Sequence, residues 1–333
     1  MGAGYKHPLE TLAIMPSWKC DVVCHHCVFS SAPSINERLS LDDITEAIKE
    51  VAAVSTVKRI TLSGGEAFLD FDYLTSIARV THSCGLLFRV VTNGSFAVDR
   101  VTAERAIGSL ASIGIEAISL SWDQYHSRFI DPARIRNAIC ACRKYGVSVR
   151  LTAVVSKVSS LSSALELLGD EAFELPITQV KCLPVGRAER KVKPGDLLPP
   201  APTDLKRACR ADFDTMSLTP NGDVFPCCAV GGFTDGIRLG RYPDESIKSL
   251  LTRRDRDLFW IVLASQGPQF FVERMTEAEK VKLGLVPGAL HDCVVCHRLF
   301  RDPAGAQVAV RVTARLREQA SLIWTELVST DAP

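Results

Sequence analysis

The sequence has no uninterrupted run of the ~18 apolar residues that a membrane-spanning helix requires, so we expect no such helix. It also lacks an export signal, because Tyr5, Lys6 and His7 stand before any apolar run in the segment Met1 to Lys19. These two absences argue against a membrane protein and a secreted protein. The cytoplasm is therefore the expected compartment.

An excess of charge of either sign is missing as well. Lys and Arg total 39, Asp and Glu total 38, and the formal net charge is +1. A polyanionic partner or an anionic membrane surface selects for a strong basic excess. We therefore expect no nucleic-acid partner and no membrane partner.

Cysteine, in contrast, is plentiful, with 12 residues in the chain. A disulfide framework belongs to small secreted domains, and this chain has no export signal. Most of the cysteines fall in short-spaced groups typical of metal sites in reducing compartments: Cys20, Cys24, Cys27, Cys209, Cys227, Cys228, Cys293 and Cys296. We read the remainder, Cys84, Cys140, Cys142 and Cys182, as inert residues in apolar surroundings.

Between Thr11 and Leu183, β-rich apolar runs alternate with helical patterns. The expected strands are Leu12–Met15, Arg59–Leu62, Leu87–Val91, Ala117–Ser121, Val147–Val154 and Gln179–Leu183. The expected helices between them are Leu41–Val54, Asp72–His82, Thr102–Ile113, Pro132–Tyr145 and Ser160–Leu168, the first opened by a capping signal at Ser40 and Asp43. This repetition predicts an α/β fold with a parallel sheet.

Six such units fall short of an eight-unit barrel, so we expect a partial (β/α)6 TIM-like barrel with its chemistry at the carboxyl ends of the strands. The predicted domains are a barrel (1–190), a proline-rich linker (191–203), a second domain (204–301) and a C-terminal helix (302–333). In the second domain, Asn221-Gly222 between apolar runs predicts a hairpin, and a helical stretch is expected over Ile247–Gln266.

Cys20, Cys24 and Cys27 follow the first expected strand with the spacing Cys-x-x-x-Cys-x-x-Cys. Three thiolates can hold three irons of a [4Fe-4S] cluster and leave the fourth iron open. A structural zinc is the alternative, with His25 or His26 as the fourth ligand.

Further motifs follow the next strands. Each motif, taken alone, fits an ordinary turn. Ser63-Gly64-Gly65-Glu66 follows the second strand, Thr92-Asn93-Gly94 the third, and Ser121 to His126 the fourth. Parallel strands bring these segments to one edge of the sheet, beside the cysteine loop.

Together with the cysteine loop, these segments resemble the radical S-adenosylmethionine (radical SAM) superfamily. The resemblance implies that the open iron binds SAM, that Gly64, Gly65 and Glu66 contact its amino group, and that Asn93 belongs to the SAM site. It further implies that Ser121, Asp123 and Arg187 contact the ribose and carboxylate, and that His26 lies near the adenine.

In such enzymes the reduced cluster cleaves SAM, and the 5′-deoxyadenosyl radical takes a hydrogen atom from an unactivated C–H bond. The difficult chemistry belongs to the cofactor, while the protein positions the target and excludes solvent. The resemblance also implies an external electron donor such as flavodoxin or ferredoxin.

Cys209, Cys227, Cys293 and Cys296 offer a second set of four thiolates. Spacing alone fits an auxiliary [4Fe-4S] cluster and a structural zinc equally well. The region resembles the SPASM and twitch extensions of radical SAM enzymes, which implies a cluster. Because no cysteine follows Cys296, we expect one auxiliary cluster, as in the shorter twitch type.

Cys228 stands beside an expected ligand and is not needed as one. A thiol there can return a hydrogen atom to a carbon radical from the opposite face, which inverts the stereocentre. The chain from about Thr11 to Phe300 resembles the radical SAM peptide epimerases, which convert L residues to D residues in ribosomally made peptides, in Cys20 to Ser31, Ser63 to Asp70, Ser121 to His126 and Phe225 to Cys228.

Three alternatives to peptide epimerisation stay open at this point: oxidation of a peptide, such as crosslinking or thioether formation; epimerisation or dehydrogenation of a sugar such as an aminoglycoside; and a non-catalytic zinc-binding protein. No separate leader-binding module is expected before the first cysteines. We therefore expect substrate recognition at the barrel mouth or in Ile247–Val286, although the aromatic residues of that segment, Phe259, Trp260, Phe270 and Phe271, fit a core better than a binding surface.

Overall fold

Parallel strands alternate with helices through the first half of the chain, which confirms the predicted α/β fold. The computed structural model describes residues 8–201, 208–209, 213–286 and 290–330. The strands are β1 (Thr11–Ile14), β2 (Arg59–Leu62), β3 (Leu87–Thr92), β4 (Ala117–Ser121), β5 (Ser148–Val155) and β6 (Ile177–Lys181). The helices are α1 (Leu41–Ala52), α2 (Phe71–Ser83), α3 (Arg100–Ile113), α4 (Pro132–Lys144), α5 (Leu161–Glu166) and α6 (Ala188–Lys191).

Helix α1 shows how the local sequence sets these elements. The Ser40 side chain accepts a hydrogen bond from the main-chain N–H of Asp43, as the capping signal predicts. Its buried residues recur at helical spacing and face the sheet: Ile44, Ala47, Ile48 and Val51.

The sheet continues beyond the six expected strands. Its order is β6-β5-β4-β3-β2-β1-β7-β8-β9 in the described part of the chain, where β7 is Thr215–Leu218, β8 is Asp223–Phe225 and β9 is Gly240–Arg241. Strand β7 is parallel to β1, whereas β7–β8 is the antiparallel hairpin that Asn221-Gly222 predicts. Gly222 has φ +84°, which suits such a turn. The region expected to form a second domain is therefore joined to the barrel wall through the main chain.

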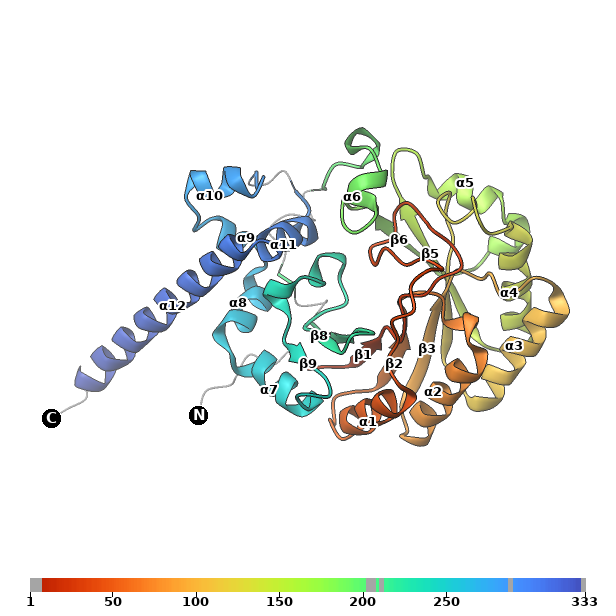
Figure 1. Ribbon diagram of the computed structural model, residues 1–333, viewed down its shortest axis with the longest axis horizontal. Coiled ribbons are helices and arrows are strands. Elements are labelled where there is room, and N and C mark those ends of the chain that lie inside the picture. The colour runs from red at the N-terminus through yellow and green to blue at the C-terminus, as the bar shows by residue number, and fades with distance from the viewer. Residues whose placement is uncertain (1–7, 202–207, 210–212, 287–289, 331–333) are drawn as a thin grey trace.

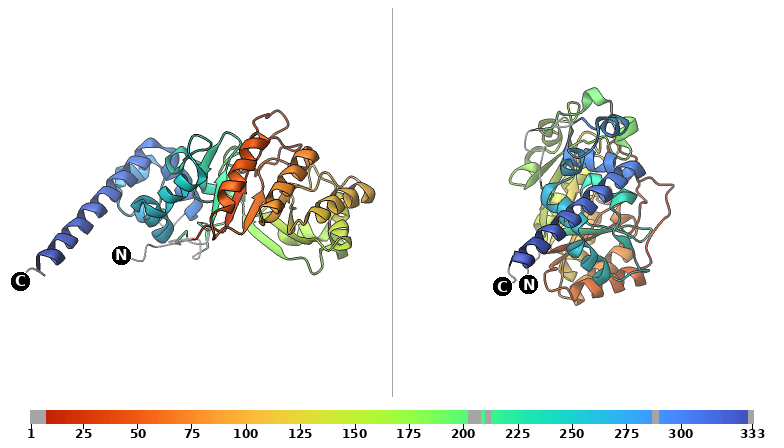
Figure 2. Two further views of the ribbon diagram at one scale, coloured as in Figure 1. Left: turned by 90° about the horizontal axis from the view of Figure 1, so that it is seen from below. Right: turned by 90° about the vertical axis from the view of Figure 1, so that its left-hand side faces the viewer.

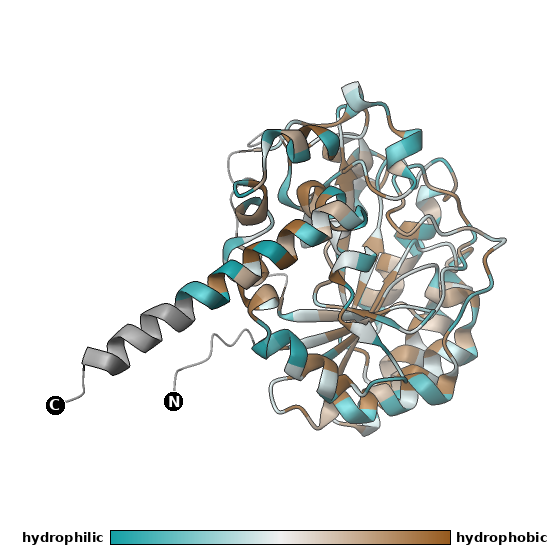
Figure 3. Ribbon diagram, turned by 60° about the vertical axis from the view of Figure 1, so that its left-hand side comes forward, coloured by the Kyte–Doolittle hydropathy of each residue, from teal (hydrophilic) through white to brown (hydrophobic). Residues whose placement is uncertain are grey.

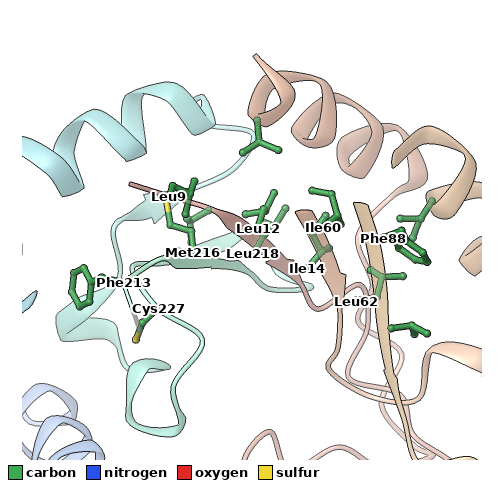
Figure 4. Packing of buried hydrophobic residues seen from close by; sticks show 14 of the residues in the cluster. Leu9, Leu12, Ile14, Ile60, Leu62, Phe88, Phe213, Met216, Leu218 and Cys227 are labelled. Carbon is green, nitrogen blue, oxygen red and sulfur yellow. The ribbon is translucent and has the colours of Figure 1, made fainter. Parts of the chain in front are cut away.

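The core follows this continuous sheet. Figure 4 shows Leu12 and Ile14 of β1 between Ile60 and Leu62 of β2 on one side and Met216 and Leu218 of β7 on the other. In Figure 1 helices α1 to α5 cover the outer face of the parallel strands. Apolar residues concentrate on the strands and on the inner faces of these helices (Figure 3).

The last third of the chain is helical. Its helices are α7 (Ile247–Arg256), α8 (Leu258–Gln266), α9 (Gln269–Val272), α10 (Glu277–Lys282), α11 (Asp292–Arg301) and α12 (Pro303–Thr330). Helix α12 extends away from the rest of the molecule (Figure 2). No helix among the described residues combines the length and apolar character needed to cross a membrane.

The helical stretch predicted over Ile247–Gln266 is confirmed at both ends, but Asp257 divides it into the two helices α7 and α8. This residue has an extended conformation, and its side chain accepts from the N–H of Phe259, so one helix ends and another begins there. The aromatic residues of this region form a core instead of a binding surface: Phe259 contacts the rings of Trp260, Phe271 and Phe300.

The predicted domain boundaries remain predictions. Within the expected linker, Pro194–Asp196 forms a short 3-10 helix. Residues 202–203 of that linker and the expected start of the second domain at residue 204 lie outside the described residues.

Candidate active site lined by cysteines

The loop after β1 carries Cys20, Cys24 and Cys27 to the carboxyl ends of the parallel strands. All three line a cavity of about 250 Å³. The main-chain N–H of Cys27 donates to the carbonyl of Cys24, which turns the loop back on itself. The structure thus brings together the three thiols that the spacing predicts as iron ligands.

Burial makes these thiols reluctant to ionise without a metal. It raises the pKa of Cys20 to about 12 and raises that of Cys24 even further. Iron binds the thiolate, so cluster loading must displace the protons from these buried thiols. The donor set, three thiols on one cavity wall, fits a cluster with one iron left open.

Gly64 and Gly65 let the segment after β2 lie directly against the cysteine loop. Two main-chain hydrogen bonds, each 2.9 Å long, hold the segments together: Gly65 N donates to Ser17 O, and Glu66 N donates to Lys19 O. A Cβ on Gly65 would stand 1.9 Å from Lys19 O, and Gly64 has φ +108°. Both glycines line the cavity. They are also required because a larger residue at either position would collide with the cysteine loop or strain the backbone.

Glu66 lines the same cavity, and the protein holds its carboxylate with three hydrogen bonds. One oxygen accepts from Thr92 Oγ1 (2.7 Å) and Phe68 N (3.1 Å), and the other accepts from Asn93 N (2.8 Å). Burial raises the pKa of Glu66 to about 7 against these hydrogen bonds, which lower it. A carboxylate has about four acceptor positions, so one remains for a ligand.

Asn93 and Ser121 line the cavity from the ends of β3 and β4. Asn93 Nδ2 donates to Asp21 Oδ1 at 2.9 Å and lies 3.8 Å from Cys20 Sγ. Asn93 therefore links the Thr-Asn-Gly segment to the cysteine loop.

His26 is buried on the cavity between two rings. Its ring centroid lies 4.8 Å from those of Tyr125 and His126. Burial lowers the pKa of His26 to about 3, so its imidazole is neutral at ordinary pH. A neutral aromatic ring suits contact with the adenine of SAM, which is the contact predicted for His26.

Asp123 supports this group from behind the cavity lining. Its oxygens accept from the main-chain N–H groups of Tyr125, His126 and Val154, and Nδ1 of His126 lies 3.0 Å away. Burial alone would raise the pKa of Asp123, but the adjacent imidazoles and these hydrogen bonds lower it to about 2. Its contacts are structural, and its predicted contact with SAM stays a prediction.

Arg187 likewise has protein partners. Nη1 donates to Cys24 O (2.8 Å), and Nη2 donates to Ser30 O and Ser31 O (2.7 and 2.5 Å). The buried guanidinium therefore braces the cysteine loop, and its predicted role at the SAM carboxylate also stays a prediction. Gly186 allows this approach, because a Cβ there would stand 2.2 Å from Val28 O.

The second set of cysteines also comes together. Cys209, Cys227, Cys293 and Cys296 line one small buried cavity between the β7–β8 hairpin and α11. Burial raises the pKa of Cys227 and Cys296 well above the usual value, and the neighbouring thiols of the set raise both further. Four thiols around one enclosed space fit a fully coordinated metal centre.

Helix α11 supplies two members of this set from its first turns. Cys293 and Cys296 are three residues apart and share one helix face, near the amino end where the helix dipole favours a thiolate. Gly231 and Gly232 close the site, since added Cβ atoms would meet Cys293 O at 2.0 Å and Cys227 Sγ at 2.7 Å. These glycines are not among the site residues predicted from the sequence, although the Gly-Gly pair follows Cys227-Cys228 closely.

Cys228 differs from its neighbour. Cys227 is buried in the four-cysteine site, whereas Cys228 alone among the cysteines is exposed in the described part of the chain. The hairpin thus separates two adjacent thiols into a buried one and an exposed one.

The comparisons with known proteins agree with this geometry. Residues 14–166 match the family described as "Radical SAM superfamily". These residues form a radical SAM domain. Enzymes of this superfamily use SAM and a [4Fe-4S] cluster, which the cysteine loop, Gly64-Gly65-Glu66 and the cavity between them suit.

Two curated relatives differ in the activity that their names give. YydG of Bacillus subtilis (strain 168), named a peptide biosynthesis protein, is 25% identical over 295 residues, which cover 88% of this chain and 92% of YydG. GTP 3′,8-cyclase of Brucella ovis is 24% identical over 188 residues, covering 51% of this chain and 52% of that protein.

Solved structures support the fold. The chain aligns with anSMEcpe, solved with AdoMet and a Cp18Cys peptide, with a TM-score of 0.56 and 15% identity, over 93% of this chain and all of that one. It aligns with BtrN, solved with AdoMet and 2-DOIA, with a TM-score of 0.51 and 13% identity, over 79% and 89% of the two chains.

Proposed function

We propose that this radical SAM enzyme inverts the Cα stereocentre of residues in a ribosomally synthesised peptide, in the cytoplasm. The observation that carries the proposal is the contrast between Cys227, buried in the four-cysteine site, and Cys228, exposed next to it. The peptide substrate is supported by the similarity to YydG over most of both chains.

In this proposal Cys20, Cys24 and Cys27 hold the [4Fe-4S] cluster, while Gly64, Gly65, Glu66, Asn93, Ser121, Asp123, His26 and Arg187 form or support the SAM site. Cys209, Cys227, Cys293 and Cys296 hold one auxiliary [4Fe-4S] cluster. When bound, the first cluster and SAM supply a 5′-deoxyadenosyl radical that removes the Cα hydrogen.

Cys228 then completes the inversion. Its S–H bond breaks as the hydrogen atom adds to the opposite face of the planar Cα radical, which leaves a sulfur-centred radical. One electron from an external low-potential donor, such as flavodoxin or ferredoxin, and one proton from solvent restore the thiol. Because the thiol exchanges with solvent, the new Cα hydrogen derives from water.

The test is anaerobic turnover with SAM and a reductant in D2O, using short peptides encoded beside the gene and a random-sequence peptide library. Amino-acid analysis should find D residues, each with one solvent deuterium. Cys228→Ala should still form 5′-deoxyadenosine but no D residue, whereas Cys140→Ala on α4 serves as the matched control with normal turnover.

Two outcomes would overturn this proposal. Formation of D residues by Cys228→Ala at the normal rate would remove the thiol from the reaction. A product lighter by two hydrogens, formed equally well by that variant, would identify an oxidative enzyme instead.

A further inference from the structure

A second cavity, of about 380 Å³, lies between the cysteine loop, the β7–β8 hairpin and α11. Aromatic rings form its walls: Trp18 stacks on Phe29 at 4.9 Å, and Phe233 meets the edges of Phe29 and Phe225 at 5.2 and 5.3 Å. We call this cavity the aromatic pocket. Its walls come from the two parts of the chain that carry the two cysteine sites.

The aromatic pocket directly adjoins the cavity lined by Cys20, Cys24 and Cys27, which we call the reaction cavity. Val28 and Phe29 line both spaces, so one short segment of the cysteine loop forms the partition between them. A substrate with its reacting carbon in the reaction cavity therefore has a neighbouring group within reach of the aromatic pocket.

Most of the polar side chains at the pocket margin have protein partners. Thr219 Oγ1 donates to Asn221 Oδ1 at 2.6 Å, and Asn221 Nδ2 donates to Asp223 Oδ2 at 2.7 Å. Arg301 pairs with Glu189 at 2.9 Å. These pairings satisfy the charged groups at the margin within the protein, while the aromatic walls offer a ligand apolar contact.

Two polar atoms of this lining are exceptions, the Thr234 hydroxyl and Nδ1 of His297, which have no hydrogen-bond partner among the described residues. Thr234 is the more deeply buried residue, with 6% of its surface exposed. A buried hydroxyl without a partner is costly until a ligand supplies an acceptor, and a peptide carbonyl is such an acceptor.

We propose that the aromatic pocket binds an apolar side chain of the substrate, next in sequence to the residue that reacts, with its backbone carbonyl accepting from Thr234. That the occupant is a peptide rests on the proposed function; the apolar selectivity rests on the pocket. Phe233 is thus a specificity-determining residue for this enzyme.

The test measures binding rather than turnover. Ligand-observed NMR on the cluster-reconstituted enzyme with SAM would compare N-acetyl-leucinamide with N-acetyl-aspartamide. The leucine derivative should bind at least about tenfold more tightly, because it buries apolar surface at no cost in desolvated charge. Phe233→Trp, which narrows the pocket, should reduce this preference.

Phe233→Leu keeps an apolar wall and serves if the tryptophan variant does not fold; it should weaken the leucine derivative about threefold to tenfold. Val281→Trp adds the same ring at an exposed site on α10 and should change nothing. Equal binding of the two derivatives, or unchanged binding in both Phe233 variants, would overturn the proposal.

The two proposals fail separately. Selective binding that depends on Phe233, without any D residue formed, leaves the aromatic pocket in place and removes the epimerase. If D residues form at sites without apolar neighbours and the fragments bind unselectively, the epimerase proposal stands and the aromatic-pocket proposal falls.

Discussion

Glu66 is the residue whose protonation most directly affects the SAM site. With a pKa of about 7, its carboxyl is half protonated near neutral pH, and the neutral form is favoured below that value. In the proposed SAM site the amino group of SAM donates to this carboxylate, so ligand binding should favour the ionised form.

We therefore expect SAM to bind about tenfold more tightly at pH 8 than at pH 6, because the ionised fraction of a group with pKa 7 rises by about that factor. Calorimetry on the cluster-reconstituted enzyme would measure this profile. Glu66→Gln should bind more weakly with a flat profile.

Thr92→Val provides the sharper control. It removes the 2.7 Å hydrogen bond that stabilises the ionised carboxylate, so the midpoint of the profile should move to higher pH. An unchanged midpoint in Thr92→Val would show that Glu66 does not govern the dependence.

Arg187 is the second residue with a measurable role, as a brace of the cysteine loop. Arg187→Met would leave buried carbonyls of Cys24 and Ser31 without donors, which should cost about 3 kcal/mol in the free energy of unfolding. Urea unfolding measures this loss, and the variant should also bind less iron at the first site.

Arg143→Met is the matched control. Arg143 also donates to two main-chain carbonyls, Glu171 O and Phe173 O, but in an exposed setting. Water can replace those bonds, so the loss should be below about 1 kcal/mol. Equal losses in the two variants would contradict the bracing role of Arg187.

At the scale of elements, the segment after β2 depends on Gly65. Gly65→Ala would drive a Cβ into Lys19 O and separate this segment from the cysteine loop. We expect a loss of about 2 to 3 kcal/mol and weaker SAM binding. Gly195→Ala, with no atom within 4 Å of the new Cβ, is the control and should be neutral. Thermal unfolding of both variants makes the comparison.

The sequence predicts most elements because their signals are local. Alternating apolar runs fix each strand to within about two residues, and Ser40 marks the start of α1 through its own cap. Asp257 defeats the same reasoning: apolar periodicity continues across it, while its capping role depends on a conformation that periodicity does not report.

Pairings between distant segments could not be predicted in this way. The residues Thr215–Leu218 carry no signal that they pair with β1, about two hundred residues earlier. Likewise, the sequence near Arg187 does not indicate that its guanidinium reaches the cysteine loop. The site residues were found because strand ends converge, whereas their supporting contacts required the folded chain.

For the whole molecule, the buried thiols link iron content to stability. A thiol whose pKa rises from 9 to about 12 on folding stabilises the iron-free protein below pH 9, and this contribution is lost between about pH 9 and 12. In the iron-loaded protein the same sulfurs are held as thiolates and carry no such proton.

We therefore expect the stability gap between iron-loaded and iron-free protein to widen between pH 8.5 and 10.5, by about 3 kcal/mol for Cys20 alone. Urea unfolding of both forms, anaerobically, would measure the gap. Cys142 is also buried but titrates alike in both forms, so it cancels. A constant gap would mean that the cysteine loop opens when iron is absent.

The pairing of β1 with β7 sets a limit on how the molecule can move. Both cysteine sites are attached to one hydrogen-bonded ladder, with Thr11 to Ile14 in register with Thr215 to Leu218. A hinge between the barrel and the β7–β8 hairpin would have to break that ladder, so the loop after β1 and the hairpin before Cys227 are expected to move as one unit. Admission of substrate and departure of product then fall to the loops at the strand ends.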